Sequence, residues 1–134
     1  MRFTGKERQR VSDKMFYEND GMDEDSCLRL YDNSYEFYKL VLETFVGDIK
    51  KTLDGMRENL AAGDPENYRI FVHGLKGAGG SAGAKDLVEL ATKSNALIKE
   101  GKWDEAKQLH EPIIAELERL QKIIPERIKA KLGE

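Results

Sequence analysis

IFVHGLKGAGGSAGA, residues 70–84, is the stretch from which the fold of this chain can be worked out. It contains His73, one of only two histidines, and five of the twelve glycines follow within the next ten residues. Each glycine in a helix interior costs roughly 1 kcal/mol relative to alanine. Because these glycines destabilise a helix, their presence next to His73 suggests that exposed backbone without side chains is needed beside the imidazole.

The residues on either side of the histidine predict one amphipathic helix. Asp64-Pro65-Glu66 is a typical helix start, because the aspartate can cap the first turn and proline suits the first helical position. On a wheel of about 100° per residue, the apolar and small side chains fall within about 60° of Tyr68. These side chains are Phe71, Val72, Leu75, Gly79 and Ala82. We expect them to face the core, and we expect the helix to turn or fray within residues 79–83.

His73 lies on the other face of this predicted helix, about 140° from Tyr68. A core histidine is disfavoured because the apolar stripe is complete without it, whereas an ordinary solvated histidine stays open as an alternative. Glycines on the same face favour the close approach of another molecule instead. The residues that could contact such a molecule, or the group that it brings, are Arg69, Ile70, Lys76, Gly77 and Gly80.

An exposed imidazole beside a lysine suits phosphoryl chemistry. Histidine titrates near neutrality, so a neutral ring nitrogen is available as a nucleophile and can form a phosphoramidate. Lys76, one turn after His73, could offset the charge of the phosphoryl group and donate hydrogen bonds to its oxygens, and Arg69 could assist. Phosphoryl transfer depends mostly on positioning and charge, so a docking face suffices if the partner supplies the metal and the acidic site.

Apolar residues at intervals of three and four predict two further helices before this one. A short helix is expected over residues 23–31 and a long one over residues 35–60. Asn33 or Ser34 can cap the long helix, and Gly63 stops it.

Two more helices are expected after it. One covers residues 87–98 and closes at Gly101, and the other runs over residues 102–124. Pro112 removes one backbone hydrogen bond inside the last helix and predicts a kink, while Pro125 is expected to end or bend it.

Four amphipathic segments joined by short connections are typical of an antiparallel four-helix bundle. The fold is therefore expected to be all-α, with one helical-bundle domain over residues 23–134. Residues 1–22 are mostly polar, and we interpret them as an N-terminal tail or an additional helix appended to the bundle.

Composition excludes several classes of protein. The net charge is -3, from 22 basic and 25 acidic residues, which argues against a nucleic-acid-binding surface. Cys27 is the single cysteine, so no disulfide can form within the chain and a reducing compartment is expected. No apolar run approaches the roughly 18 residues that a membrane span needs, and the first residues show no signal peptide. We expect a cytoplasmic protein that binds neither nucleic acid nor a membrane.

Metal binding and autonomous catalysis are also disfavoured. The second histidine, His110, is far from the first and sits near the edge of an apolar stripe, where a structural role is expected. No pair of histidines or cysteines has the spacing of a metal site. The glycines do not form a nucleotide-binding loop, because they neither follow a strand nor end in Lys-Ser or Lys-Thr. We therefore expect no cofactor and no kinase activity of the chain's own.

HGLKGAGGSAGAKDL, residues 73–87, resembles the signature of histidine-containing phosphotransfer (HPt) domains. That signature runs His-x-Leu-Lys-Gly, then small residues, then an apolar residue with Gly-Ala, then a leucine. The upstream segment CLRLYDNSYEFYKLVLETF also looks like the first helices of the family, and the resemblance covers roughly residues 23–124. The residues on signature positions are His73, Leu75, Lys76, Gly77, Gly83, Ala84 and Leu87.

The resemblance implies a phosphocarrier in a phosphorelay. His73 would accept a phosphoryl group from an aspartyl phosphate on a response-regulator receiver domain and pass it to another receiver. Lys76 would stabilise the phosphohistidine, and Gly77 would keep the surface open for docking. Receiver domains and a sensor histidine kinase are the implied partners, and magnesium would belong to the receiver.

One alternative of another class stays open. The chain could be a non-phosphorylated helical adaptor that binds a receiver or a kinase domain through the same face. The presence of His73 together with Lys76 favours the phosphocarrier, because docking alone requires neither side chain.

Overall fold

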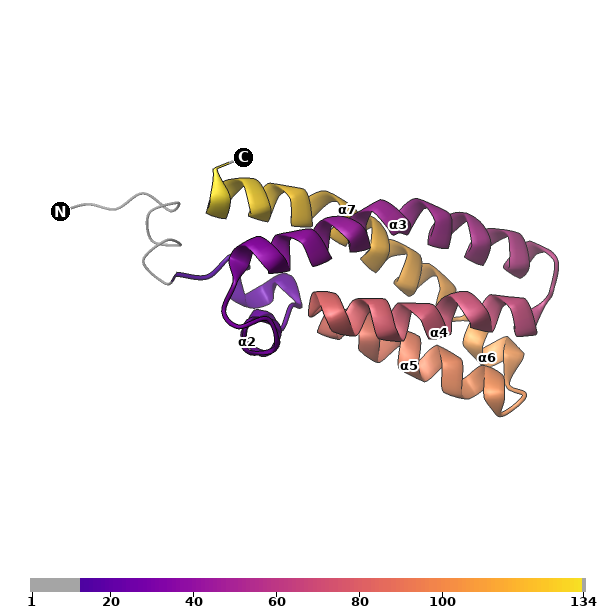
Figure 1. Ribbon diagram of the computed structural model, residues 1–134. Coiled ribbons are helices and arrows are strands. Elements are labelled where there is room, and N and C mark those ends of the chain that lie inside the picture. Colours follow the sequence, from indigo (N-terminus) through magenta and orange to yellow (C-terminus); the bar gives the residue numbers. More distant parts are fainter. Residues whose placement is uncertain (1–12, 134) are drawn as a thin grey trace.

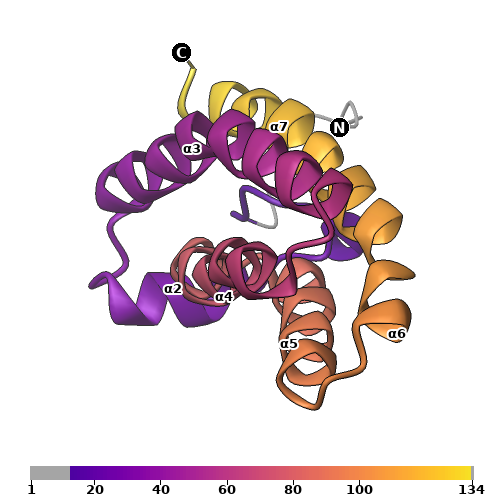
Figure 2. The ribbon, with the colours of Figure 1, turned by 90° about the vertical axis from the view of Figure 1, so that its right-hand side faces the viewer.

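The computed structural model describes residues 13–133, and every element in that range is helical. The long helices are α3 (Tyr35–Ala61), α4 (Pro65–Ala82), α5 (Lys85–Lys99) and α7 (His110–Leu132). The short elements are η1 (Glu18–Asp20), α2 (Glu24–Leu30) and α6 (Trp103–Lys107). Consecutive long helices run in opposite directions around one core (Figure 1, Figure 2). The predicted all-α antiparallel bundle is confirmed.

The ends of the central helices follow the local sequence. Ser34 caps α3 by accepting a backbone hydrogen bond at 3.1 Å, whereas Asn33 takes a left-handed conformation with φ of 59° just before it. Asp64 caps α4 in the same way at 3.1 Å, and Gly83 closes α4 with φ of 80°. The helix that carries His73 therefore begins and ends where the sequence predicts.

The last predicted helix is instead two helices, α6 and α7. Pro112 stands in the first turn of α7, where backbone N–H groups have no partner within the helix, so the predicted cause of a kink is absent. Of the two effects expected of Pro125, an end or a bend, the end is wrong, because α7 continues to Leu132. Ile124 and Ile128 on either side of it are buried, and their burial offsets the cost of about 3 kcal/mol of an interior proline.

The described part of the N-terminal segment packs against the bundle. Met15 and Phe16 are buried, and the Glu24 carboxylate accepts hydrogen bonds from both of their backbone N–H groups at 2.8 to 3.0 Å. Asp20 forms an ion pair with Arg127 of α7 at 2.8 Å. The residues before Asp13 lie outside the described range, and the division of the chain after residue 22 stays a prediction.

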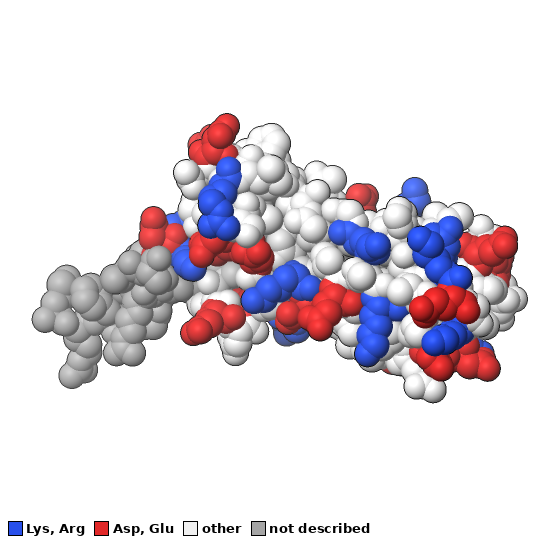
Figure 3. All heavy atoms as spheres, turned by 90° about the horizontal axis from the view of Figure 1, so that it is seen from below, with Lys and Arg blue, Asp and Glu red and all other residues white. Residues whose placement is uncertain are grey.

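Charged side chains of both signs are mixed on the surface. Seen from below, Lys and Arg alternate with Asp and Glu, without a broad area of one sign (Figure 3). This face therefore lacks the clustered basic surface that nucleic-acid binding requires. Among the helices of residues 13–133, none combines the length and the hydropathy needed to cross a membrane.

Candidate functional site

His73 lies on the outer face of α4 and is exposed to solvent. The reason lies in the residues next to it in the chain. Val72 and Leu75 belong to the apolar face of α4, are 0% and 4% exposed, and hold the helix against the core, so His73 points away from the core. The ring is not enclosed by apolar side chains. The structure thus leaves the imidazole accessible to a visiting molecule.

Two cationic side chains lie on the same helix as His73. Arg69 and Lys76 are each half-buried, one turn before and one turn after it. Within residues 13–133 neither side chain forms an ion pair or hydrogen bond with another group. Their charges are therefore not neutralised by the protein and remain available to an anion that approaches the imidazole.

The glycines of α4 divide into two kinds. A Cβ added at Gly77 or Gly80 would meet no other atom within 4 Å, so packing within the chain does not require glycine at either position. Gly79 is buried, and a Cβ there would lie 3.0 Å from Cγ2 of Val88 in α5, so this glycine allows close helix packing. The exposed glycines leave bare backbone on the face of His73, as the wheel predicts. Ile70, 62% exposed, lies close by in the chain.

The structure adds a groove that the sequence analysis missed. It lies between α3 and α4 and has a volume of about 360 Å³. Phe37 and Leu40 of α3 are 50% and 60% exposed at this groove, large values for such apolar side chains. The lining residues are Phe37, Leu40, Val41, Thr44, Phe45, Asp48, Ala78 and Ser81. We call it the α3–α4 groove.

The α3–α4 groove adjoins the exposed glycines of α4. Ala78 follows Gly77 in the chain and Ser81 follows Gly80, so one wall of the groove continues into the bare backbone. A signal for the other wall was present in the sequence. Phe37 and Leu40 fall about 100° and 160° from the core-facing Tyr38 on a helical wheel, on the side where polar residues are expected.

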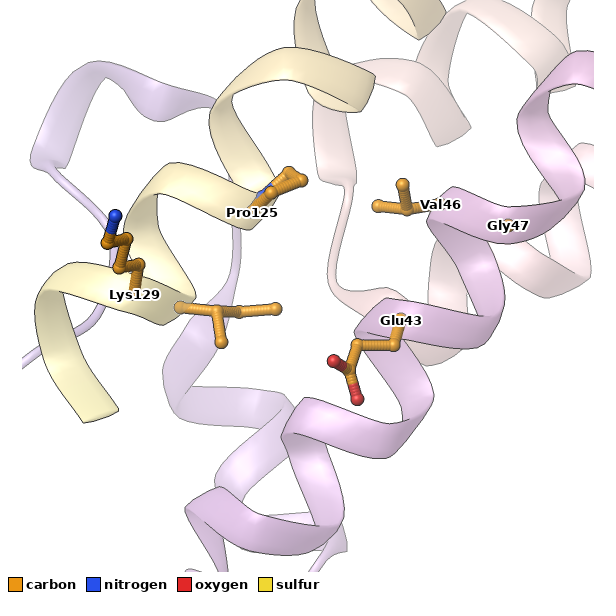
Figure 4. A pocket seen from close by; sticks show the side chains of 6 residues that line it. Glu43, Val46, Gly47, Pro125 and Lys129 are labelled. Atoms are coloured by element: carbon orange, nitrogen blue, oxygen red, sulfur yellow. The ribbon is translucent and has the colours of Figure 1, made fainter. Parts of the chain in front are cut away.

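A second cavity, of about 370 Å³, lies between α3 and α7. In Figure 4, Glu43 and Val46 of α3 point toward α7, which contributes Pro125 and Lys129. None of the residues predicted to act in phosphoryl transfer or docking lines it. Among residues 13–133 no group of three or more His, Cys, Asp or Glu side chains is placed to hold a metal ion.

His110 has the structural place that the sequence suggests. It is 4% exposed, and its Nδ1 lies 2.9 Å from the Tyr68 hydroxyl, a contact that joins α7 to α4. Burial lowers the pKa of His110 below its ordinary value of 6.5, and the nearby Arg57 acts in the same direction while Glu111 opposes it. The neutral imidazole is therefore the form that the fold favours.

We expect the chain to lose stability as the pH falls below about 6.5. In the unfolded chain His110 takes up a proton at its ordinary pKa, whereas the folded chain resists protonation until a lower pH. The unfolded state then binds more protons, so the free energy of unfolding falls with pH until the folded pKa is passed. Urea unfolding at a series of pH values measures this. A His110→Gln variant should be less stable but flatter over the same range, and an equally steep profile would contradict the assignment.

Comparisons with known proteins bear on this site. A family model described as Hpt domain matches residues 40–123. The fold is similar to that in the crystal structure of histidine-containing phosphotransfer protein B (HptB) from Pseudomonas aeruginosa PAO1, with a TM-score of 0.72 and 24% sequence identity. That similarity covers 84% of this chain and 98% of the other. No curated protein matches the chain.

Proposed function

This chain belongs to the Hpt domain family, and from that premise we propose that His73 carries a phosphoryl group between receiver domains. Hpt domains are phosphocarriers of phosphorelays and not kinases. The observation that carries the proposal is the exposed imidazole of α4 beside an unpaired lysine and bare backbone. A cytoplasmic location, expected from the sequence, is part of the same proposal.

The transfer forms one bond and breaks one bond. A lone pair on a neutral ring nitrogen of His73 attacks the phosphorus of an aspartyl phosphate on the receiver. The bond between phosphorus and the aspartate oxygen breaks, and the aspartate leaves as a carboxylate. His73 then holds a phosphorus–nitrogen bond, while its other ring nitrogen keeps its proton. The reverse reaction delivers the group to the aspartate of a second receiver, and neither step needs a nucleotide.

Charge stabilisation is shared between the two proteins. We assign to Lys76 the role of donating hydrogen bonds to the phosphoryl oxygens, with Arg69 as a further cation at the edge of the site. The receiver supplies Mg²⁺ and the acidic groups that bind it. This chain contributes the nucleophile, its position and one or two positive charges.

The docking face extends beyond the imidazole. We propose that a receiver approaches the backbone at Gly77 and Gly80, where no side chain keeps it away, and covers Ile70. The exposed Phe37 and Leu40 of the α3–α4 groove enlarge this face with apolar surface, which is typical of a protein interface. Receiver domains and the sensor histidine kinase upstream of them are the proposed partners.

Label transfer tests the proposal. The full chain is mixed with a receiver whose aspartate carries radioactive phosphate, and the products are separated and treated with acid or alkali. Label that moves to this chain and is lost in acid supports a phosphohistidine. Stable binding of the phosphorylated receiver without any transfer would favour the helical adaptor instead.

A Lys76→Ala variant is expected to transfer the label about 10- to 100-fold more slowly, the range of one charge-assisted hydrogen bond. The phosphohistidine should also hydrolyse faster, because the phosphoryl oxygens lose their donor. Transfer rate and phosphohistidine lifetime are the two measurements. Lys122→Ala, which removes an exposed lysine of α7, is the matched control and should change neither. If Lys76→Ala behaves like the control, the role assigned to Lys76 is wrong.

A further inference from the structure

Tyr31, the residue that ends α2, connects the two walls of the α3–α4 groove. Its hydroxyl donates a hydrogen bond to the Ser81 carbonyl of α4 at 2.7 Å. Its ring lies against that of Phe37 in α3, with centroids 5.1 Å apart and planes at 55°. Ser81 and Phe37 both line the groove, so one side chain contacts each wall.

The end of α4 needs such support. The last carbonyls of a helix lack partners within it, and here the backbone of the turn reaches only two of them: Gly79 accepts from Ala84 at 2.8 Å and Gly80 accepts from Gly83 at 3.2 Å. The carbonyls of Ser81 and Ala82 therefore accept hydrogen bonds from side chains instead.

Side chains of α2 and α3 bind these two carbonyls. Tyr38 donates to Ala82 at 2.6 Å, and Tyr31 donates to Ser81. The Cys27 thiol lies 3.5 Å from the same Ser81 oxygen. Because the preceding turns are rich in glycine, the helix end has little intrinsic stability. These donors hold its backbone in place, together with the hydrogen bond from the Asp23 N–H to the Gly83 carbonyl at 2.6 Å.

Of the two tyrosines, Tyr38 belongs to the fully buried core, whereas Tyr31 is only partly buried against it. Tyr38 is 0% exposed and is part of the central packing. Tyr31 is half-buried at the surface, beside the groove. Removing its hydroxyl leaves the ring contact with Phe37 in place and releases only the bond to α4.

We infer that Tyr31 is a positioning residue for receiver docking, acting through the Ser81 carbonyl and the Phe37 ring. Tyr31 fixes the distance between the α4 wall and the α3 wall of the groove. It thereby also fixes the position of the exposed glycine backbone of α4 that leads to His73. The inference rests on the proposed function, because that proposal assigns the groove to the receiver.

The test compares Tyr31→Phe with the wild-type chain in three measurements. The probe is a receiver domain that transfers label to the wild-type chain. Its dissociation constant should rise about 3- to 10-fold, the range of one lost neutral hydrogen bond. The backbone amides of Gly83 and Ala84 should exchange faster with deuterium in the free variant. Phosphorylation of His73 by the small donor phosphoramidate should not change, because it needs no docking.

Tyr68→Phe is the matched control. It also removes a tyrosine hydrogen bond between helices, the contact with His110, but on the side of α4 that faces α7. It should lower stability and leave the dissociation constant of the receiver unchanged.

Two results would overturn the inference. Equal affinity of Tyr31→Phe and wild type is one. The other is weaker binding without faster exchange at Gly83 and Ala84, which would mean that the hydroxyl contacts the receiver directly. Failure of the proposed function is distinguishable, because the wild-type chain itself would then take no label from any receiver.

Discussion

Replacing His73 with glutamine is expected to reduce label transfer from a phosphorylated receiver to background. Glutamine is polar and of similar size but has no nucleophilic nitrogen. The other candidate nucleophiles of the described chain are enclosed, because His110 is 4% exposed and bonded to Tyr68 and Cys27 is 3% exposed. Since His73 is exposed on the helix surface, the free energy of unfolding should change by no more than about 0.5 kcal/mol.

The control for this experiment is His110→Gln. It removes the other histidine and should cost stability, because a buried partner of the Tyr68 hydroxyl is lost. The folded fraction should still take label at the wild-type rate. Acid-labile label that persists in His73→Gln would refute the assignment of the phosphoacceptor.

The second large effect is expected from Gly77→Leu. The isolated chain should become more stable by roughly 0.5–1 kcal/mol, because leucine favours a helix and a Cβ at this position meets no atom within 4 Å. The affinity for a receiver should fall about 10- to 100-fold, because the added side chain stands where the partner backbone must approach. Stability and affinity therefore change in opposite directions, which a general loss of fold cannot produce.

Thermal unfolding and a binding titration with the receiver measure the two effects. Gly47→Leu is the matched control, since Gly47 is another exposed helical glycine whose Cβ would meet nothing within 4 Å. Gly47 lies on α3 beside the cavity that faces α7 and does not line the α3–α4 groove. The Gly47→Leu variant should be more stable than the wild-type chain and should bind the receiver with unchanged affinity. Unchanged affinity in Gly77→Leu would contradict the open-face argument.

The sequence predicted the helices well where the capping residues and the spacing of apolar residues indicated the same helix. Asp64 and Gly83 mark the ends of α4, and the stripe through Tyr68 is the buried face that the wheel predicts. The prediction from proline was right at Pro65, where α4 begins, but the kink expected at Pro112 and the helix end expected at Pro125 were wrong. The effect of Pro112 depends on whether it stands within the first turn of a helix, and the continuation through Pro125 depends on apolar neighbours buried by other helices.

The sequence by itself determined that His73 faces outward. A helix with one complete apolar stripe turns that stripe toward the core, so a residue on the opposite face must point toward solvent. It also determined that bare backbone lies beside the imidazole. Only the tertiary structure decided that Phe37 comes to lie across a groove from Ser81 and that Tyr31 contacts both. Such contacts join residues far apart in the chain, so they depend on how the helices pack and not on the spacing within any one of them.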